Sequence, residues 1–169
     1  MAIPLAGQLV RASHYPKIKV IKKNSLESVT SSTTLQDDDD FVVSLEASKI
    51  FLIHLFLVVG GATAGDIKLD WTVTGGVAGY TSRNCLGMAV AGTNSADTTM
   101  RATSHTLSTS VPYGIETANG TIREDFLVET VTSGTSGTLT LRWAQNTSNA
   151  TATSANASSM MTIEEVEEI

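Results

Sequence analysis

The chain has 169 residues, of which 41% are hydrophobic and only 17% are charged, and its formal net charge is −6. This length fits one domain with extensions, and the acidic balance argues against nucleic acid as the main partner because phosphate binding needs a basic surface. Threonine, valine and glycine are frequent, which predicts an all-β domain. The single cysteine, Cys85, excludes a disulfide within the chain, and we expect it to be a small core or semi-buried residue.

The first 23 residues are basic and contain no acid. We expect residues 1–16 to form an extended arm, and Lys17–Lys23 to form a short strand. The basic residues either dock on an acidic neighbour or protect a solvated edge strand, and both interpretations stay open. Pro4 and Gln8 interrupt the short apolar stretch, which is unlike a signal peptide, so we expect synthesis in a cytoplasm.

Four consecutive aspartates, Asp37–Asp40, predict a solvated turn over Leu35–Asp40. A calcium loop is the alternative, but the EF-hand pattern is absent. Phe41–Leu45 and Lys49–Val59 then predict a hairpin across Glu46–Ser48. The apolar run Ile50–Val59 is shorter than the ~20 residues of a membrane helix, so we expect a strand that is buried on both faces, with its histidine in the core or at an interface.

Asp66–Thr74 shows the clearest alternation in the chain, with Trp71 on its apolar face. Such alternation predicts an antiparallel sheet with one face in the core. Weaker patterns predict further strands at Leu86–Ala91, Met100–Leu107, Thr121–Thr132 (with Ile122, Phe126 and Val128 inward), Thr138–Ala144 and Met160–Val166. Eight to ten strands in this spacing predict an antiparallel β-sandwich, of which the jelly roll is the eight-stranded version.

No motif predicts chemistry, so we expect no enzyme activity, catalytic residue, cofactor or metal site. The histidines at positions 14, 54 and 105 are isolated, and zinc-ligand spacings are absent. Glu124 and Asp125 are adjacent in a predicted strand and should point to opposite faces, which argues against a shared carboxylate site. The chain contains four N-glycosylation sequons, as expected by chance in a sequence this rich in asparagine, serine and threonine, and we expect them to be unmodified.

The segment Asn146–Ser159 is rich in serine, threonine, asparagine and alanine. Its side chains can bond to nearby backbone and so compete with regular ladders. One interpretation is a surface loop. The other is a strap between subunits, whose small residues let a second chain approach closely.

Several segments carry a resemblance to a known family. They are TTLQDDDD (Thr33–Asp40) with the following Phe41–Ala47, the apolar strand Phe51–Val59, the loop and strand Thr63–Val73, GTLTLRWAQNT (Gly137–Thr147) and Ala152–Met161. The GTLTLRWAQNT segment is the most specific of them. Over about residues 27–167 this order resembles a family of tailed-bacteriophage and prophage virion structural proteins. The chain departs from the family pattern at Ser158-Ser159, where a Gly-Ser is common, and in its acidic last strand.

The resemblance implies a jelly-roll-like sandwich over residues 24–169, behind an N-terminal arm of residues 1–23. It implies a homotrimer that decorates the capsid exterior as a cement protein and grips the major capsid protein through the arm. Neither nucleic acid nor membrane is an expected partner. The alternative is a tail-fibre or minor tail component that binds a host-surface glycan, with Tyr80 and Tyr113 as stacking platforms.

Overall fold

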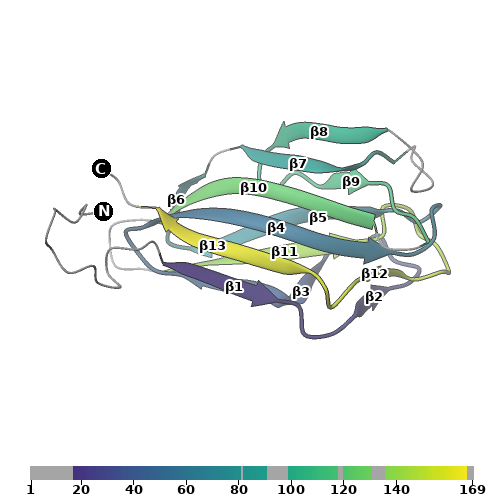
Figure 1. Ribbon diagram of the computed structural model, residues 1–169, viewed down its shortest axis with the longest axis horizontal. Coiled ribbons are helices and arrows are strands. Elements are labelled where there is room, and N and C mark those ends of the chain that lie inside the picture. Colours follow the sequence, from purple (N-terminus) through teal and green to yellow (C-terminus); the bar gives the residue numbers. More distant parts are fainter. Residues whose placement is uncertain (1–16, 81, 91–98, 118–119, 131–135, 167–169) are drawn as a thin grey trace, which may run out of the picture.

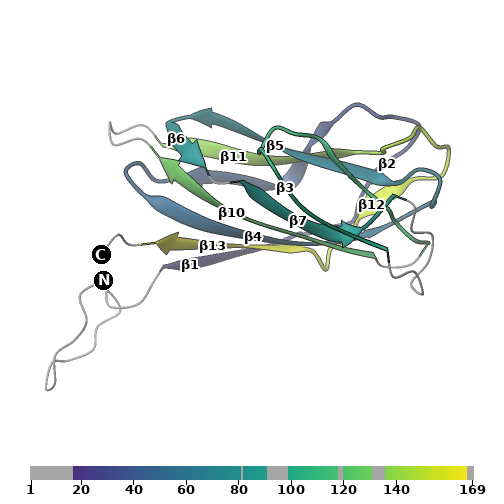
Figure 2. The same cartoon turned by 90° about the horizontal axis from the view of Figure 1, so that it is seen from above.

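The computed structural model describes residues 17–80, 82–90, 99–117, 120–130 and 136–166. Every regular element in these ranges is a β-strand, and all strand pairs are antiparallel. The strands form two layers that face each other along their length (Figures 1 and 2). The predicted all-β antiparallel sandwich is therefore confirmed, whereas residues 1–16 of the predicted arm lie outside the described residues.

The larger sheet has the strand order β1-β13-β4-β10-β7-β8. The bounds are β1 (Ile18–Lys22), β13 (Met160–Val166), β4 (Ile50–Gly60), β10 (Gly120–Thr130), β7 (Arg83–Met88) and β8 (Met100–His105). Three short strands attach to it: β12 (Thr153–Ala155) pairs with β4 and with β2 (Glu27–Val29), and β6 (Val77–Tyr80) pairs with β10. The smaller sheet has the order β3 (Gln36–Leu45), β11 (Gly137–Ala144), β5 (Ile67–Gly75) and β9 (Val111–Tyr113).

Eight of these strands have the connectivity of a jelly roll. Taken in chain order, they are β1, β3, β4, β5, β9, β10, β11 and β13. The first, eighth, third and sixth are neighbours in one sheet, and the second, seventh, fourth and fifth are neighbours in the other. This interleaved order defines the double-sheet jelly roll. The strands β6, β7 and β8 are inserted between the fourth and fifth and widen the larger sheet (Figure 1).

The core lies between the two sheets and contains both tryptophans. Trp71 of β5 is 1% exposed and Trp143 of β11 is fully buried. Trp71 meets Phe126 of β10 edge to face, with ring centroids 5.1 Å apart, and so joins the two sheets. The alternation predicted for Asp66–Thr74, Thr121–Thr132 and Thr138–Ala144 is confirmed for the residues that the structure describes, because the apolar members of β5, β10 and β11 point into this core. Residues 131 and 132 of the second segment lie outside the described residues.

The predicted hairpin between Phe41–Leu45 and Lys49–Val59 is wrong. β3 belongs to the smaller sheet and β4 to the larger one, so the connection crosses from layer to layer. Thr130 at the end of β10 fastens this crossing: its hydroxyl donates to the carbonyl of Glu46 at 2.7 Å and accepts from the amide of Lys49 at 2.9 Å. Alternation shows which residues face a core but not which sheet a strand joins.

The prediction that Ile50–Val59 is buried on both faces is also wrong for most of β4. Phe51, Ile53, Leu55 and Leu57 point into the core, while the side chain of His54 is 45% exposed on the opposite face. Only the end of the strand, residues 57–60, is buried on consecutive residues. The strand predicted at Lys17–Lys23 is confirmed as β1, which forms one edge of the larger sheet.

Candidate functional site

The aspartate run lies inside strand β3, so the predicted solvated turn is wrong. Val42 pairs with Thr140 of β11 and Asp37 pairs with Arg142, so residues 38–41 form a bulge opposite Leu141. The Oδ1 atom of Asp38 accepts hydrogen bonds from the amides of Asp40 and Phe41, both at 3.0 Å. The bend that four aspartates suggest is present, but it folds Asp38 into the core, where its exposure is 0%.

Asp38 is matched by a buried lysine. The Lys23 ammonium donates to Asp38 and to Glu27 at 2.8 Å each, and both Lys23 and Asp38 side chains are fully buried. Trp143 Nε1 donates to Asp38 Oδ2 at 3.1 Å. Burial alone would lower the pKa of Lys23, but its hydrogen bonds with Asp38 and Glu27 outweigh burial and raise that pKa. The cation held by this acidic run is therefore the chain's own ammonium.

A second buried carboxylate lies near the middle of the sandwich. Glu124 of β10 is fully buried and accepts hydrogen bonds from Trp71 Nε1 and from the Tyr113 hydroxyl, both at 2.7 Å. Arg83 Nη1 of β7 is 3.4 Å from Glu124 Oε2. Burial raises the pKa of Glu124, against the lowering effect of Arg83 and the two hydrogen bonds. Asp125 faces outward, so the predicted separation of Glu124 from Asp125 is confirmed.

The arginine of this second cluster is less well satisfied than its carboxylate. Arg83 Nη2 donates to the carbonyl of Thr109 at 2.7 Å. Its Nε and Nη1 atoms are buried and have no hydrogen-bond partner among the residues the structure describes. Cys85 lies beside it on β7 and is 2% exposed, as predicted for a core cysteine, and burial raises the pKa of its thiol. A thiol in such surroundings is a packing group rather than a nucleophile.

The histidines do not come together. His54 of β4 forms a 2.7 Å contact with Asp125 of β10 on the outer face of the larger sheet, so it is not a core residue, and the interface interpretation stays open. His105 ends β8, with β10 and β7 lying between its strand and β4. His14 lies outside the described residues. In the part of the chain that the structure describes, no group of three or more histidine, cysteine, aspartate or glutamate side chains could hold a metal ion.

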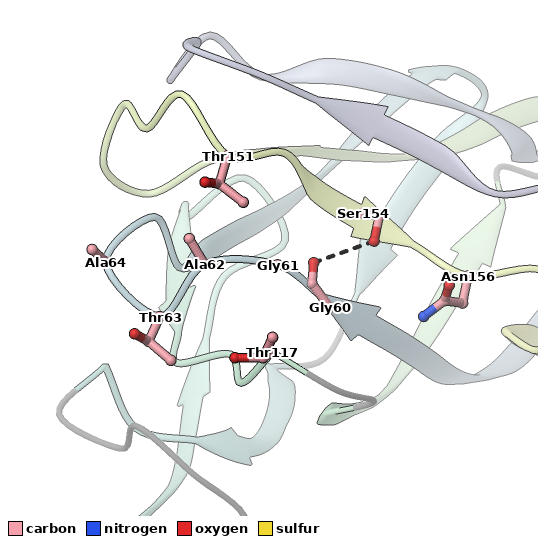
Figure 3. A pocket seen from close by; sticks show the side chains of 9 residues that line it. All are labelled: Gly60, Gly61, Ala62, Thr63, Ala64, Thr117, Thr151, Ser154 and Asn156. Carbon is pink, nitrogen blue, oxygen red and sulfur yellow. Dashed lines mark hydrogen bonds between the residues drawn. The ribbon is translucent and has the colours of Figure 1, made fainter.

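The predicted glycan platform at Tyr113 is wrong. Tyr113 is fully buried and its hydroxyl is committed to Glu124, so its ring cannot stack on a ligand. The side chain of Tyr80 lies outside the described part of the chain. The described pocket richest in hydroxyl groups has a volume of about 640 Å³ and lies where β4 ends (Figure 3). Its walls are Gly60, Gly61, Ala62, Thr63, Ala64, Thr117, Thr151, Ser154 and Asn156.

The segment Asn146–Ser159 is bound to its own chain. Gln145 accepts from the amides of Ser32 and Asn149 and donates to the carbonyl of Thr151. The strand β12 then pairs with β2 and β4, which the sequence patterns did not predict. Gly61 allows this packing, because a Cβ there would lie 2.6 Å from the Ala152 carbonyl oxygen. The surface-loop interpretation fits residues 146–152 but is wrong for β12, where Thr153 and Ala155 are fully buried, and a role as a strap between subunits stays a prediction.

The outer faces of the two sheets differ in chemistry. On the smaller sheet, Thr138 pairs with Thr74 and Thr140 with Thr72, and Arg142 holds Asp70 through two hydrogen bonds of 2.9 and 2.7 Å. The larger sheet instead exposes apolar side chains, with Val20 at 59%, Ile18 at 56% and Met160 at 41% exposure. A sheet face of the second kind is typical of an interaction surface.

Comparisons with known proteins show no family. No family model matches the chain, and no curated protein matches it. Among solved structures, the chain is similar at 13% identity and a TM-score of 0.26 to the infectious bursal disease virus Gt strain structure, and at 12% identity and the same TM-score to the VP2 subviral particle of that virus. Both alignments cover 99% of this chain and 47% of the other, so the chain spans about half the length of these proteins.

TM-scores of this size lie below those of chains that share a fold. The described ranges contain no helix with the length and apolar character needed to cross a membrane.

Proposed function

We propose that this chain is a virion structural protein of a tailed bacteriophage or prophage, and that it decorates the capsid exterior as a homotrimeric cement protein. The observation that supports the proposal is the contact between two of the segments that carry the family resemblance. Asp38 from the TTLQDDDD segment accepts the Trp143 Nε1–H from the GTLTLRWAQNT segment at 3.1 Å. The strands that contain them, β3 and β11, are neighbours in the smaller sheet.

These motif residues hold the fold together. Leu139, Leu141 and Trp143 are fully buried, and Gln145 fixes the loop that follows. A motif made of core and loop-anchoring residues supports a shared architecture rather than a shared reaction. The jelly-roll strand order agrees with it, since viral capsid domains use this architecture, as do lectin domains and cupins.

A cement role asks the chain to bind other proteins and to carry no reaction, so we propose no enzyme activity. In this proposal residues 1–16, the part of the arm that precedes β1, contact the major capsid protein, and the protein is made in the host cytoplasm before it joins the particle. The lysines at positions 17, 19 and 22 lie at or beside the exposed edge strand β1, which places positive charge at the base of the proposed arm.

Antibody labelling of intact particles, viewed by electron microscopy, tests the location. Regular label over the head supports the decoration role, whereas label confined to the tail end contradicts it. Particles without label contradict any place in the virion. The arm is then tested by deleting residues 1–16: binding to capsids that lack the protein should be lost while the circular dichroism spectrum of the sandwich is kept. Retained binding would exclude the arm as the capsid contact.

A tail-fibre component that binds a host glycan is the second candidate, and the pocket of Figure 3 is the observation that favours it. Four hydroxyl side chains and one asparagine line this pocket, and such groups can exchange hydrogen bonds with a sugar. Ala62→Phe should fill the pocket and abolish binding to host cells, while Ser44→Phe on the outer face of the smaller sheet should leave binding unchanged. Absence of binding by the unmodified protein contradicts this candidate.

A further inference from the structure

We propose that the outer face of the larger sheet is the surface through which copies of this chain bind one another. The inference rests on the self-association that the proposed function requires, and it assigns that contact to a named surface. The surface, called the outer face below, consists of the outward side chains of β1, β13, β4, β10, β7 and β8. They form rows across the six strands, because the registers of neighbouring strands are continuous.

Three rows carry most of the face. The first runs Lys22, Met160, Phe56, Arg123, Leu86 and Ala102, and the second runs Val20, Thr162, His54, Asp125, Asn84 and Ser104. The third runs Ile18, Glu164, Leu52 and Leu127. Apolar side chains appear in every row, and several are among the most exposed large hydrophobic residues of the described chain. Large apolar side chains that stay exposed on several neighbouring strands are typical of a contact with another macromolecule.

The charges on the outer face are separated along the strand direction. The first row contains Lys22 and Arg123, and the third row contains Glu164. Glu129 lies one row further on, opposite Ile50 of β4. Between these ends, His54 and Asp125 contact each other at 2.7 Å. The outer face therefore has a basic end and an acidic end, with apolar side chains at both.

This arrangement of charges indicates that the outer face binds a second copy of the chain. A ring of three copies joins two different patches of the chain at each contact. The basic end of one copy and the acidic end of the next are such a pair, and they complement each other in charge. The outer face of the smaller sheet offers no equivalent, because its arginine is paired with Asp70 inside the same chain and threonines flank that pair.

Two valines give a matched test. Val20 on β1 is 59% exposed on the outer face, and Val42 on β3 is 47% exposed on the opposite side of the sandwich. Both lie on edge strands, so an aspartate at either position should leave the fold intact. Sedimentation of the purified full chain, diluted to about 1 µM, should show an oligomer for the unmodified protein and for Val42→Asp, and a monomer for Val20→Asp.

A charge exchange tests the pairing of unlike ends. Lys22→Glu and Glu164→Lys should each weaken self-association about tenfold or more, and the double variant should restore it, because the ends again carry opposite charge. A double variant as weak as the single ones overturns the pairing. Equal dissociation by Val42→Asp and Val20→Asp overturns the choice of face, and so does a monomeric unmodified protein.

The proposed virion role and the proposed interface between copies can be contradicted independently. A monomer in solution removes the interface but leaves the particle labelling to decide the location in a virion. An oligomer that dissociates as expected, with no label on particles, removes the virion role and leaves the interface standing.

Discussion

The two buried carboxylates of this sandwich are held in different ways. Asp38 accepts hydrogen bonds from Lys23, from Trp143 and from two backbone amides, and its partner Lys23 reaches two carboxylates at 2.8 Å. Glu124 is equally buried, but its partner Arg83 has two buried nitrogens without hydrogen bonds among the described residues. In the first cluster both the acid and the base have hydrogen-bond partners, whereas in the second cluster only the acid is fully hydrogen-bonded. We therefore expect the first to contribute more to stability and to resist replacement.

The largest effect should come from Lys23→Met. This change leaves Asp38, Glu27 and Asp40 close together without their cation. Removing one partner from a buried ion pair costs about 3–5 kcal/mol of unfolding free energy, because the remaining charge is uncompensated. Urea denaturation monitored by tryptophan fluorescence measures this loss. A loss below about 1 kcal/mol would show that the ammonium is not the centre of the cluster.

Replacing both partners of each ion pair should show the difference in stability between the two clusters most clearly. Arg83→Met with Glu124→Gln keeps a carbonyl oxygen that accepts from Trp71 Nε1, and its amide NH2 can donate to the Tyr113 hydroxyl. The double variant also removes the unsatisfied nitrogens, so the cost should be about 1 kcal/mol or less. Lys23→Met with Asp38→Asn leaves Glu27 and Asp40 without their cation, so about 2–3 kcal/mol should still be lost. Equal costs for the two double variants would contradict the difference between the clusters.

Arg83→Met alone should cost less than Lys23→Met, about 2 kcal/mol at neutral pH, since Glu124 keeps its two neutral donors. The loss should depend on pH. Burial already raises the pKa of Glu124 above 4.5, and removal of Arg83 raises it further. The folded state then holds a proton that the unfolded state releases, so the variant loses stability as pH rises above about 4.5. Denaturation midpoints from pH 4 to 8 would reveal this slope, and a gap to the unmodified protein that stays constant over this range would contradict it.

Sequence patterns predicted the fold better than the charged core. The alternation of β5, β10 and β11 identified their inward residues, since period two is a local property of the strand. The same alternation in β10 places Glu124 between Ile122 and Phe126 on the inward side, so the signal for a buried acid was present in the chain. Asp38 had no such signal. Its burial depends on Lys23 and Trp143, which meet it only after β3 and β11 pair.

The exposed apolar residues of the outer face were not predicted, for a related reason. Ile18, Val20 and Met160 are ordinary members of short strands in the sequence, and only the register of β1 with β13 makes them neighbours. The crossing from β3 to β4 is also non-local, because each strand finds its partners far along the chain. The alternation within a strand predicts which side chains lie on the same side of it. The pairing of strands then decides which of these side chains become neighbours on a surface.

A third carboxylate forms an ion pair that is partly exposed, and we expect it to contribute less to stability than the two buried carboxylates. Glu165 of β13 contacts Lys49, and Lys17 lies 3.2 Å from it with 71% of its side chain exposed. The hydrogen bond with Lys49 lowers the pKa of Glu165 below its ordinary value of 4.5. An acid with a lowered pKa stabilises the folded state above pH 4.5, and this contribution is lost as pH falls through the folded-state pKa.

Glu165→Gln should therefore cost only about 0.5 kcal/mol at neutral pH, because solvent screens the exposed lysine. The difference from the unmodified protein should decrease as pH falls below 4.5, vanish below the folded-state pKa of Glu165, and shrink in high salt. Thermal melts of Glu165→Gln and of the unmodified protein, run side by side, measure this difference at pH 7 and at pH 3. A loss as large as that of Lys23→Met would contradict the ranking, since it would make exposure unimportant to the strength of these pairs.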